Sequence, residues 1–171
     1  PTSMVRYRSP SLPKSPYITA QGFRLLKAEQ QTLWSRRRKV TLALAASASE
    51  RDRSENAEYI YRKKELRELD RRIRYLQKRL PEVKVVSQPP SDQSRVYFAA
   101  WVSLEKADGS EYRYRIVGPD EIDREAGYIS MDSPLAKALM KRGLDDQVPV
   151  MTPGGTEIYW ITAIEYVTEE N

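Results

Sequence analysis

The 171-residue sequence contains no cysteine and no histidine. The lack of cysteine excludes disulfides, thiolate zinc sites and cysteine nucleophiles. The lack of histidine excludes serine–histidine triads, histidine general bases and histidine metal ligands. Any acid, base or metal chemistry of this chain must therefore use carboxylates, lysines or tyrosines.

Long apolar runs are also missing. No stretch approaches the roughly 20 apolar residues of a membrane-spanning helix, and no signal-peptide pattern precedes the first predicted helix. We therefore expect a cytoplasmic protein with no membrane association. A chain of this length has room for one medium domain or two small ones.

Charge is distributed unevenly along the chain. Residues 1–80 contain 20 Lys and Arg against 8 Asp and Glu, whereas residues 81–171 contain 9 against 16. Such a split is typical of two modules with different partners. The basic half suits a polyanion, and the acidic half suits a basic protein surface.

Two long helical patterns dominate the first half. Mostly apolar residues recur at alternating steps of three and four over residues 23–44 and again over residues 59–80, as in a heptad repeat. The repeat is imperfect, because the first pattern has Gln30 and Arg37 at two of its seven positions. Pro81 ends the second pattern, because proline disfavours helix in the residue before it. The connection is shorter than about ten residues, so helices of about 27 residues each must run antiparallel. We predict a coiled-coil hairpin over residues 18–80.

Proline-containing segments flank the hairpin. Residues 1–17 are rich in Pro and Ser, which predicts a disordered arm. Residues 81–94 contain three prolines, which predicts a linker of limited flexibility. The period then changes from helical to strand-like, so we place a second domain at residues 95–171.

This second domain has the pattern of a small α+β fold. Alternating and β-branched stretches predict strands at residues 96–104, 111–117, 148–152 and 157–167. A short helix is predicted from Pro134 to Arg142, with Ser133 as its N-cap and Gly143 just beyond its end. An antiparallel sheet with one helix and no glycine-rich phosphate loop predicts a docking domain.

The segment between the two helices carries two carboxylates three residues apart, Asp52 and Glu55. One interpretation is a capping box, in which Asp52 caps the second helix and Glu55 reaches back to the cap. Helix N-termini favour negative charge, which supports that interpretation. The other interpretation is functional, because the pair lies at the far turn of the hairpin among cations. The spacing allows both.

Cations line one face of the second helix at three- and four-residue spacing, namely Lys64, Arg67, Arg71, Arg74 and Lys78. A run of four more, at residues 36–39, lies at a similar height on the first helix. One interpretation is a solvated charged face, with Glu65, Glu68 and Asp70 as partners in the same helix. The other is contact with nucleic acid, because excess cations at this density repel one another unless an anion is present. Tyr59 and Tyr61 either stack on a base or pack the end of the hairpin.

Several blocks of the chain together match a known pattern. They are residues 52–59 (DRSENAEY), 66–76, 112–122 (YRYRIVGPDEI), 128–139 (YISMDSPLAKAL) and 163–167 (AIEYV). In this order they resemble the Gre transcript-cleavage factors of bacterial RNA polymerase, of the GreB type. The resemblance covers most of residues 17–167.

The resemblance implies a transcription elongation factor. Members of that family insert the coiled-coil hairpin through the secondary channel of RNA polymerase, while an FKBP-like domain grips the channel rim. The rim-binding residues would be Asp132, Ser133 and Pro134. The tip helps the polymerase's own active site to hydrolyse backtracked RNA whose 3′ end is extruded, so the factor is not an enzyme alone. We expect a monomer.

The resemblance also implies roles for single residues. Asp52 would help to hold a second Mg²⁺, Glu55 would orient or deprotonate the attacking water, and Asn56 and Tyr59 would support the tip. Two carboxylates alone bind Mg²⁺ weakly, because the ion needs more ligands. Bound metal is therefore expected only within the polymerase complex. The cations expected to contact the extruded RNA are Lys63, Lys64, Arg67, Arg71, Arg37 and Arg38.

Two departures from the family pattern concern the tip. Arg51 stands where members usually carry Gly, and the segment 42–50 is longer by about four residues, which is about one helical turn or 6 Å. One alternative function is therefore a channel-binding regulator or inhibitor without cleavage activity.

Two further alternatives belong to other classes of protein. A basic coiled-coil RNA binder would not need the tip carboxylates. An FKBP-like prolyl isomerase would need an apolar aromatic pocket, for which the candidates are Tyr97, Phe98, Trp101, Tyr159 and Trp160.

Overall fold

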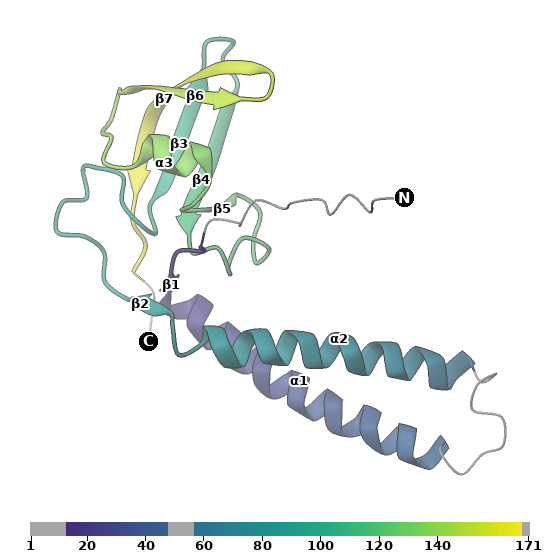
Figure 1. Cartoon of the computed structure of the whole chain (residues 1–171). Coiled ribbons are helices and arrows are strands. Elements are labelled where there is room, and N and C mark those ends of the chain that lie inside the picture. The colour runs from purple at the N-terminus through teal and green to yellow at the C-terminus, as the bar shows by residue number, and fades with distance from the viewer. Residues whose placement is uncertain (1–12, 48–56, 169–171) are drawn as a thin grey trace, which may run out of the picture.

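The structure is a computed structural model that describes residues 13–47 and 57–168. A two-helix hairpin projects from a β-sheet domain that lies at its base (Figure 1). The hairpin consists of α1 (Ala20–Ser47) and α2 (Ala57–Arg79). Its longer helix has 28 residues and therefore spans about 42 Å. The predicted antiparallel hairpin followed by a sheet domain is confirmed.

The hairpin is packed most tightly at its base. Ile18, Leu26 and Leu76 are buried there in one apolar cluster. Farther along, the heptad seam is imperfect because two of its predicted positions, Gln30 and Arg37, are polar and only half-buried. A two-helix hairpin buries little apolar surface by itself, so contact with the rest of the chain at this end stabilises it.

Two short strands join the hairpin to the sheet domain. β1 (Tyr17–Thr19) and β2 (Lys84–Val86) pair in parallel, with Ile18 opposite Val85. β2 lies inside the segment 81–94, so three residues of the predicted linker form a strand that the sequence did not indicate. The strands have three residues each, which is too short for a period to be detected in the sequence.

The second domain is built on a five-stranded sheet with the order β5-β4-β3-β7-β6. α3 (Pro134–Leu139) packs against one face of this sheet, where Ala136 and Leu139 join the main apolar core. The strands of the sheet are β3 (Trp101–Lys106), β4 (Glu111–Val117), β5 (Tyr128–Ser130), β6 (Gln147–Thr152) and β7 (Gly155–Glu165).

Three details of this domain differ from the sequence prediction. The first predicted strand begins at Trp101 rather than residue 96, because Ala99 has a φ of 72°, which interrupts extended backbone. The strand β5 was not predicted, and it pairs with β4 in parallel, so the sheet is not wholly antiparallel. The helix ends at Leu139 rather than Arg142, and Lys141, not Gly143, takes the left-handed conformation beyond it, with a φ of 67°.

Within the described part of the chain, neither hairpin helix is long and apolar enough to cross a membrane.

Candidate functional site

The free end of the hairpin is where α1 stops and α2 starts (Figure 1). The two described residues that bracket it are Ser47 and Ala57. The predicted catalytic residues Asp52 and Glu55 and the predicted supporting residue Asn56 belong to the segment between them and lie outside the described residues. Their capping and catalytic roles stay predictions.

The first turns of α2 combine aromatic, apolar and charged side chains. Tyr59 is half-buried, and the ammonium group of Lys63 lies 5.0 Å from the centre of its ring. Glu58 and Arg62 form an ion pair at 3.0 Å, one turn apart on α2. Ile60 and Tyr61 are 56% and 66% exposed. Tyr59 therefore packs within the hairpin end, whereas the Tyr61 ring is accessible to a partner.

Three ion pairs connect the two helices along the hairpin. Arg36 binds Glu65 at 2.5 Å, Arg37 binds Asp70 at 2.6 Å, and Arg72 binds Glu29 at 2.9 Å. Glu65 and Asp70 were expected to be partners of cations in the same helix, whereas the structure pairs both acids with α1. Helical periodicity indicates only partners three or four residues away on the same helix. It could not show which residues of the two helices face each other.

These pairs change the expectation for Arg37. Its guanidinium is held by Asp70 and lies 5.9 Å from the centre of the Trp34 ring. Both side chains of this pair remain about a third exposed. An ion pair that is so accessible to water contributes about 1 kcal/mol or less, so it is weak enough to exchange for a phosphate. Arg38 is exposed, and its guanidinium donates a hydrogen bond to Ser35 Oγ at 3.4 Å.

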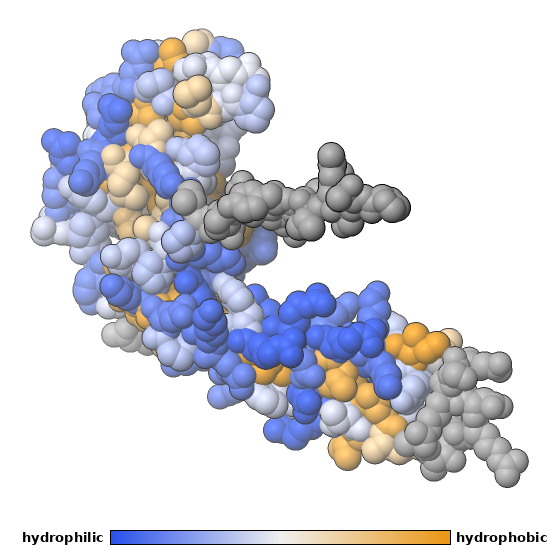
Figure 2. All heavy atoms as spheres, in the orientation of Figure 1, coloured by the Kyte–Doolittle hydropathy of each residue, from blue (hydrophilic) through white to orange (hydrophobic). Residues whose placement is uncertain are grey.

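The remaining cations of α2 form a row that we call the basic stripe, namely Lys63, Lys64, Arg67, Arg71, Arg74 and Lys78. All six are exposed, and none forms an ion pair with another residue in the part of the chain that the structure describes. Figure 2 shows the resulting hydrophilic surface along much of α2. Four acids of the hairpin, Glu29, Glu58, Glu65 and Asp70, bind other cations, and the stripe keeps its charge available for a polyanion.

The predicted docking residues lie together in the turn between β5 and α3. Ser133 caps α3, because its hydroxyl oxygen accepts a hydrogen bond from the Ala136 backbone N at 3.2 Å. Pro134 occupies the first turn and is exposed. The carboxylate of Asp132 accepts a hydrogen bond from the Ser15 backbone N at 2.9 Å. No local pattern could indicate this last contact, because 117 positions separate the two residues.

Two adjacent acids that no sequence pattern singled out lie at the base of the hairpin. Asp120 and Glu121 follow β4, and both side chains are buried. Asp120 contacts Arg79 at the end of α2, and Glu121 contacts Thr19 just before α1. They stand inside the block YRYRIVGPDEI, but a loop acid carries no sign in the sequence of whether it is buried.

The structure does not gather the candidate aromatic residues into a prolyl-isomerase pocket. Phe98 packs against Tyr17 at 6.2 Å, Trp101 against Tyr128 at 5.7 Å, and Tyr159 against Tyr112 at 6.1 Å, measured between ring centres. Three of the five candidates thus belong to three separate aromatic pairs. This arrangement gives that alternative no support.

The fit to Mg²⁺ rests on donor chemistry. In the described part of the chain no three or more Asp or Glu side chains are grouped so that they could hold a metal ion. The predicted ligand Asp52 supplies the hard carboxylate oxygen that Mg²⁺ prefers. One or two carboxylates are too few to bind Mg²⁺ tightly, so they suit a metal ion whose other ligands come from a partner.

Comparison with known proteins covers nearly the whole chain. Residues 16–85 match the family described as "Transcription elongation factor, N-terminal", and residues 90–166 match "Transcription elongation factor, GreA/GreB, C-term". A curated relative named "Transcription elongation factor GreB" from Pseudomonas aeruginosa is 53% identical, over 95% of this chain and 98% of the relative. A relative of the same name from Xanthomonas axonopodis is 50% identical, over 96% and 99%.

Among solved structures, one titled "Prokaryotic transcription elongation factor GreA/GreB from Nitrosomonas europaea" is 17% identical. Its TM-score is 0.40, and the match covers 91% of this chain and 100% of that one.

Proposed function

Because this chain belongs to the GreA/GreB family of transcription elongation factors, we propose that it acts on backtracked bacterial RNA polymerase. The hairpin enters the secondary channel and stimulates cleavage of the nascent RNA, whose extruded 3′ end lies along it. The protein works as a monomer in the cytoplasm. It is not an enzyme alone, because the polymerase provides the rest of the active site.

The observation that carries this proposal is the form of the hairpin. α1 spans about 42 Å. It ends at the free end of the hairpin, where α2 begins, and the segment that connects the two helices contains Asp52 and Glu55 in the sequence. An arm of this shape delivers two carboxylates to a site that a globular domain cannot enter. The sheet domain stays outside the channel and docks through Asp132, Ser133 and Pro134.

The chemistry assigned to the tip suits its side chains. Mg²⁺, when bound, stabilises charge on the phosphate and lowers the pKa of a bound water. Asp52 contributes an oxygen ligand, and Glu55 orients the water and accepts its proton. With neither histidine nor cysteine in the chain, carboxylates are the residues that can do this near neutral pH.

The basic stripe suits the extruded RNA. Its cations lie along one helix that starts at the free end, so a single strand leaving the polymerase active site would pass them in turn. Phosphate contacts of this kind bind RNA regardless of its sequence. Tyr61, which is 66% exposed, adds a surface on which a base can stack.

A second candidate function follows from the length of α1. This helix has 28 residues against 23 in α2 and continues through Ser47. Most of the segment 42–50, which we expect from the sequence to be longer than the family pattern by about four residues, or one turn, is therefore helical. About one extra turn lengthens the arm by about 6 Å. A protein with this arm could occupy the channel and regulate the polymerase without cleavage, because catalysis tolerates displacements of only about 1 Å.

One assay separates the two functions. Purified polymerase complexes, stalled and backtracked on a defined template, are incubated with Mg²⁺ in the presence and absence of this protein, and the labelled RNA is resolved by length. We expect short 3′ fragments to be released faster with the protein. Binding to the complexes without faster release would instead support the regulator.

A further inference from the structure

The base of the hairpin is held by two neighbouring acids of the sheet domain. Asp120 and Glu121 lie in the connection between β4 and β5, and their side chains are 4% and 1% exposed. At this base, Asp120 binds the end of α2 and Glu121 binds the start of α1. We call these two residues the acidic pair.

Asp120 binds the last turns of α2. One carboxylate oxygen accepts a hydrogen bond from Arg79 Nε at 2.7 Å, and the other accepts one from the Tyr75 hydroxyl. The Arg79 side chain is 8% exposed, so this ion pair is shielded from water. Separating this pair would leave a buried charge without a partner, which strongly destabilises a folded protein. The pair therefore holds the end of α2 against the loop.

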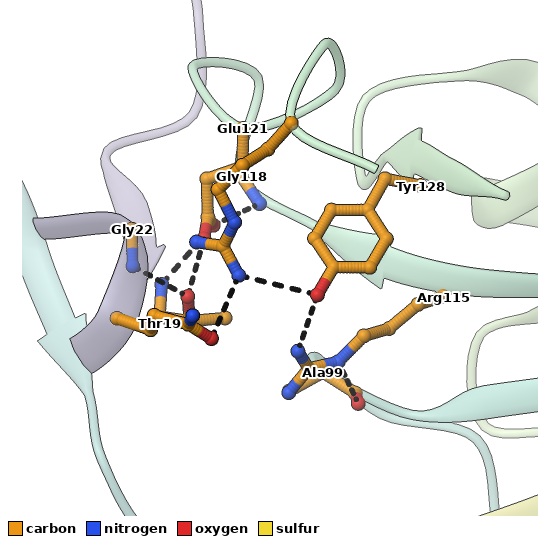
Figure 3. A network of polar contacts seen from close by, with 9 residues as sticks. Thr19, Gly22, Ala99, Arg115, Gly118, Glu121 and Tyr128 are labelled. Atoms are coloured by element: carbon orange, nitrogen blue, oxygen red, sulfur yellow. Dashed lines mark hydrogen bonds and ion pairs between the residues drawn. The ribbon is translucent and has the colours of Figure 1, made fainter. Parts of the chain in front are cut away.

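Glu121 binds the start of α1 (Figure 3). It accepts hydrogen bonds from the Thr19 backbone N at 3.1 Å and from the Thr19 hydroxyl. The Thr19 hydroxyl oxygen in turn accepts a bond from the Gly22 backbone N at 3.1 Å, within the first turn of α1. A Cβ atom at Gly22 would lie 2.1 Å from Glu121 Oε1. Only glycine at this position lets the helix approach the carboxylate so closely.

Two further contacts anchor Glu121 within its own domain. The backbone N of Gly118 donates to it at 2.9 Å, and Arg124 donates from Nη1 at 3.3 Å. The carboxylate therefore joins the sheet domain directly to the start of α1. Together the two acids fix both helices of the hairpin relative to one rigid loop.

The length of the hairpin makes this connection important. A rotation of about 5° at the base would displace a point about 42 Å away by about 3.7 Å. A displacement of about 1 Å can cost about 100-fold in the rate of a reaction. The contacts at the base must therefore define the direction of the hairpin to about a degree or two, if the tip is to reach a fixed point while the sheet domain is docked.

We propose that Asp120 and Glu121 are positioning residues for RNA cleavage, which act by fixing the direction of the hairpin relative to the docking surface. Because both side chains are buried against the base of the hairpin, the proposed role is exerted through the position of the hairpin. This inference rests on the proposed function for its consequence in cleavage. Its structural part, the fixed direction of the hairpin, is a property of the isolated chain.

The structural part can be measured by electron–electron distance spectroscopy on the full chain. The chain has no cysteine, so spin labels on Lys39→Cys in α1 and Lys137→Cys in α3 attach only at these two exposed sites. In this background we expect a narrow distance distribution, which Asp120→Asn and Glu121→Gln broaden or shift. The matched control is Asp123→Asn, an exposed acid of the same loop, which should leave the distribution unchanged.

The functional part uses the same variants without labels. At saturating protein we expect the acid variants to lower the cleavage rate on backtracked complexes by about 10-fold to 100-fold. The concentration for half-maximal binding to polymerase should change less than about threefold, because the docking turn is intact. Gly22→Ala displaces the Glu121 carboxylate without removing its charge. We expect it to lower the cleavage rate in the same way, so it tests the inference even if an acid variant folds poorly.

Two results would overturn the inference. One is a distance distribution that stays as narrow in Asp120→Asn, Glu121→Gln and Gly22→Ala as in the parent. The other is a cleavage rate that falls only as far as binding falls. If instead the parent protein does not stimulate cleavage at all, the proposed function fails, while the distance measurement still decides whether the acidic pair fixes the hairpin.

Discussion

Ser15 holds both carboxylate oxygens of Asp132. Its backbone N–H donates to Oδ2 at 2.9 Å and its hydroxyl donates to Oδ1. The carbonyl oxygen of Ser15 accepts a bond from Arg79 at the end of α2. One residue near the start of the chain therefore connects the docking turn with the base of the hairpin.

The first prediction concerns the stability that this contact provides. Ser15→Ala removes the hydroxyl bond but keeps the backbone bond, so we expect the free energy of unfolding to fall by about 1.5–3 kcal/mol, as for a hydrogen bond to a charged group. Urea unfolding measures it. The control is Ser91→Ala, at an exposed serine of the segment 81–94. Equal effects of the two substitutions would show that the Asp132 contact contributes nothing.

The second prediction separates capping from catalysis at the tip. Asn caps a helix about as well as Asp but is a poor Mg²⁺ ligand, and Gln keeps a capping box without its charge. We expect Asp52→Asn and Glu55→Gln to leave the free energy of unfolding within about 0.5 kcal/mol of the parent while abolishing cleavage of backtracked RNA. Normal cleavage by both variants would contradict the catalytic role.

The third prediction concerns the basic stripe. Lys63→Glu with Lys64→Glu places two acids where cations face the path proposed for the RNA, so crosslinking to the extruded 3′ end should fall more than binding to polymerase. Raising the salt concentration should weaken crosslinking by the parent in the same way. Lys27→Glu, an exposed cation in α1 nearer the base, is the matched control. Equal loss of crosslinking and binding would argue against an RNA role for the stripe.

The fourth prediction concerns alkaline pH and Tyr166. Burial raises the pKa of its phenol above the ordinary value of 10.0. The hydroxyl donates to the Arg95 carbonyl oxygen at 2.6 Å and accepts from the Tyr97 backbone N at 2.8 Å. The unfolded chain releases this proton first as the pH rises. The stabilisation is therefore complete below about pH 10 and is lost as the pH rises through the pKa of the folded state.

The matching substitution is Tyr166→Phe. It should lower the free energy of unfolding at pH 7 by about 1–3 kcal/mol, because two backbone groups lose their partner. It should also make the loss of stability above pH 10 less steep, although Tyr114, whose pKa burial also raises, keeps part of it. Thermal unfolding between pH 7 and pH 11 measures both effects. Tyr61→Phe, at an exposed tyrosine, should change neither.

The long elements of this fold were predictable because their signals extend over many residues. The heptad pattern placed both hairpin helices, since a period of 3.5 repeated over several turns is rare outside paired helices. The alternation of Tyr112, Tyr114 and Ile116 with charged residues placed β4 at Glu111–Val117, as observed. The N-cap of α3 at Ser133 was also correct, because serine followed by proline is a strong local signal.

The parts that were not predicted depend on contacts between distant residues. Three-residue strands such as β1 and β5 form because a neighbouring strand offers hydrogen bonds, not because of their own pattern. The start of β3 depends on the positive φ of Ala99, which no rule for alanine suggests.

The candidate site divides in the same way. Its charged stripe could be read from spacing along one helix. The pairing of Arg37 with Asp70 and the burial of Asp120 and Glu121 required the helices and the loop to be placed in space.

The parallel pairing of β1 with β2 places the entrance and the exit of the hairpin side by side on the body of the protein. Residues can therefore be inserted or deleted at the distal turn without disturbing any contact of the body. Natural variation or protein design can therefore shorten or extend the hairpin in steps of one helical turn, about 5.4 Å, while the contacts at its base stay the same. The distance that the hairpin reaches into a partner can then change independently of how the sheet domain binds that partner.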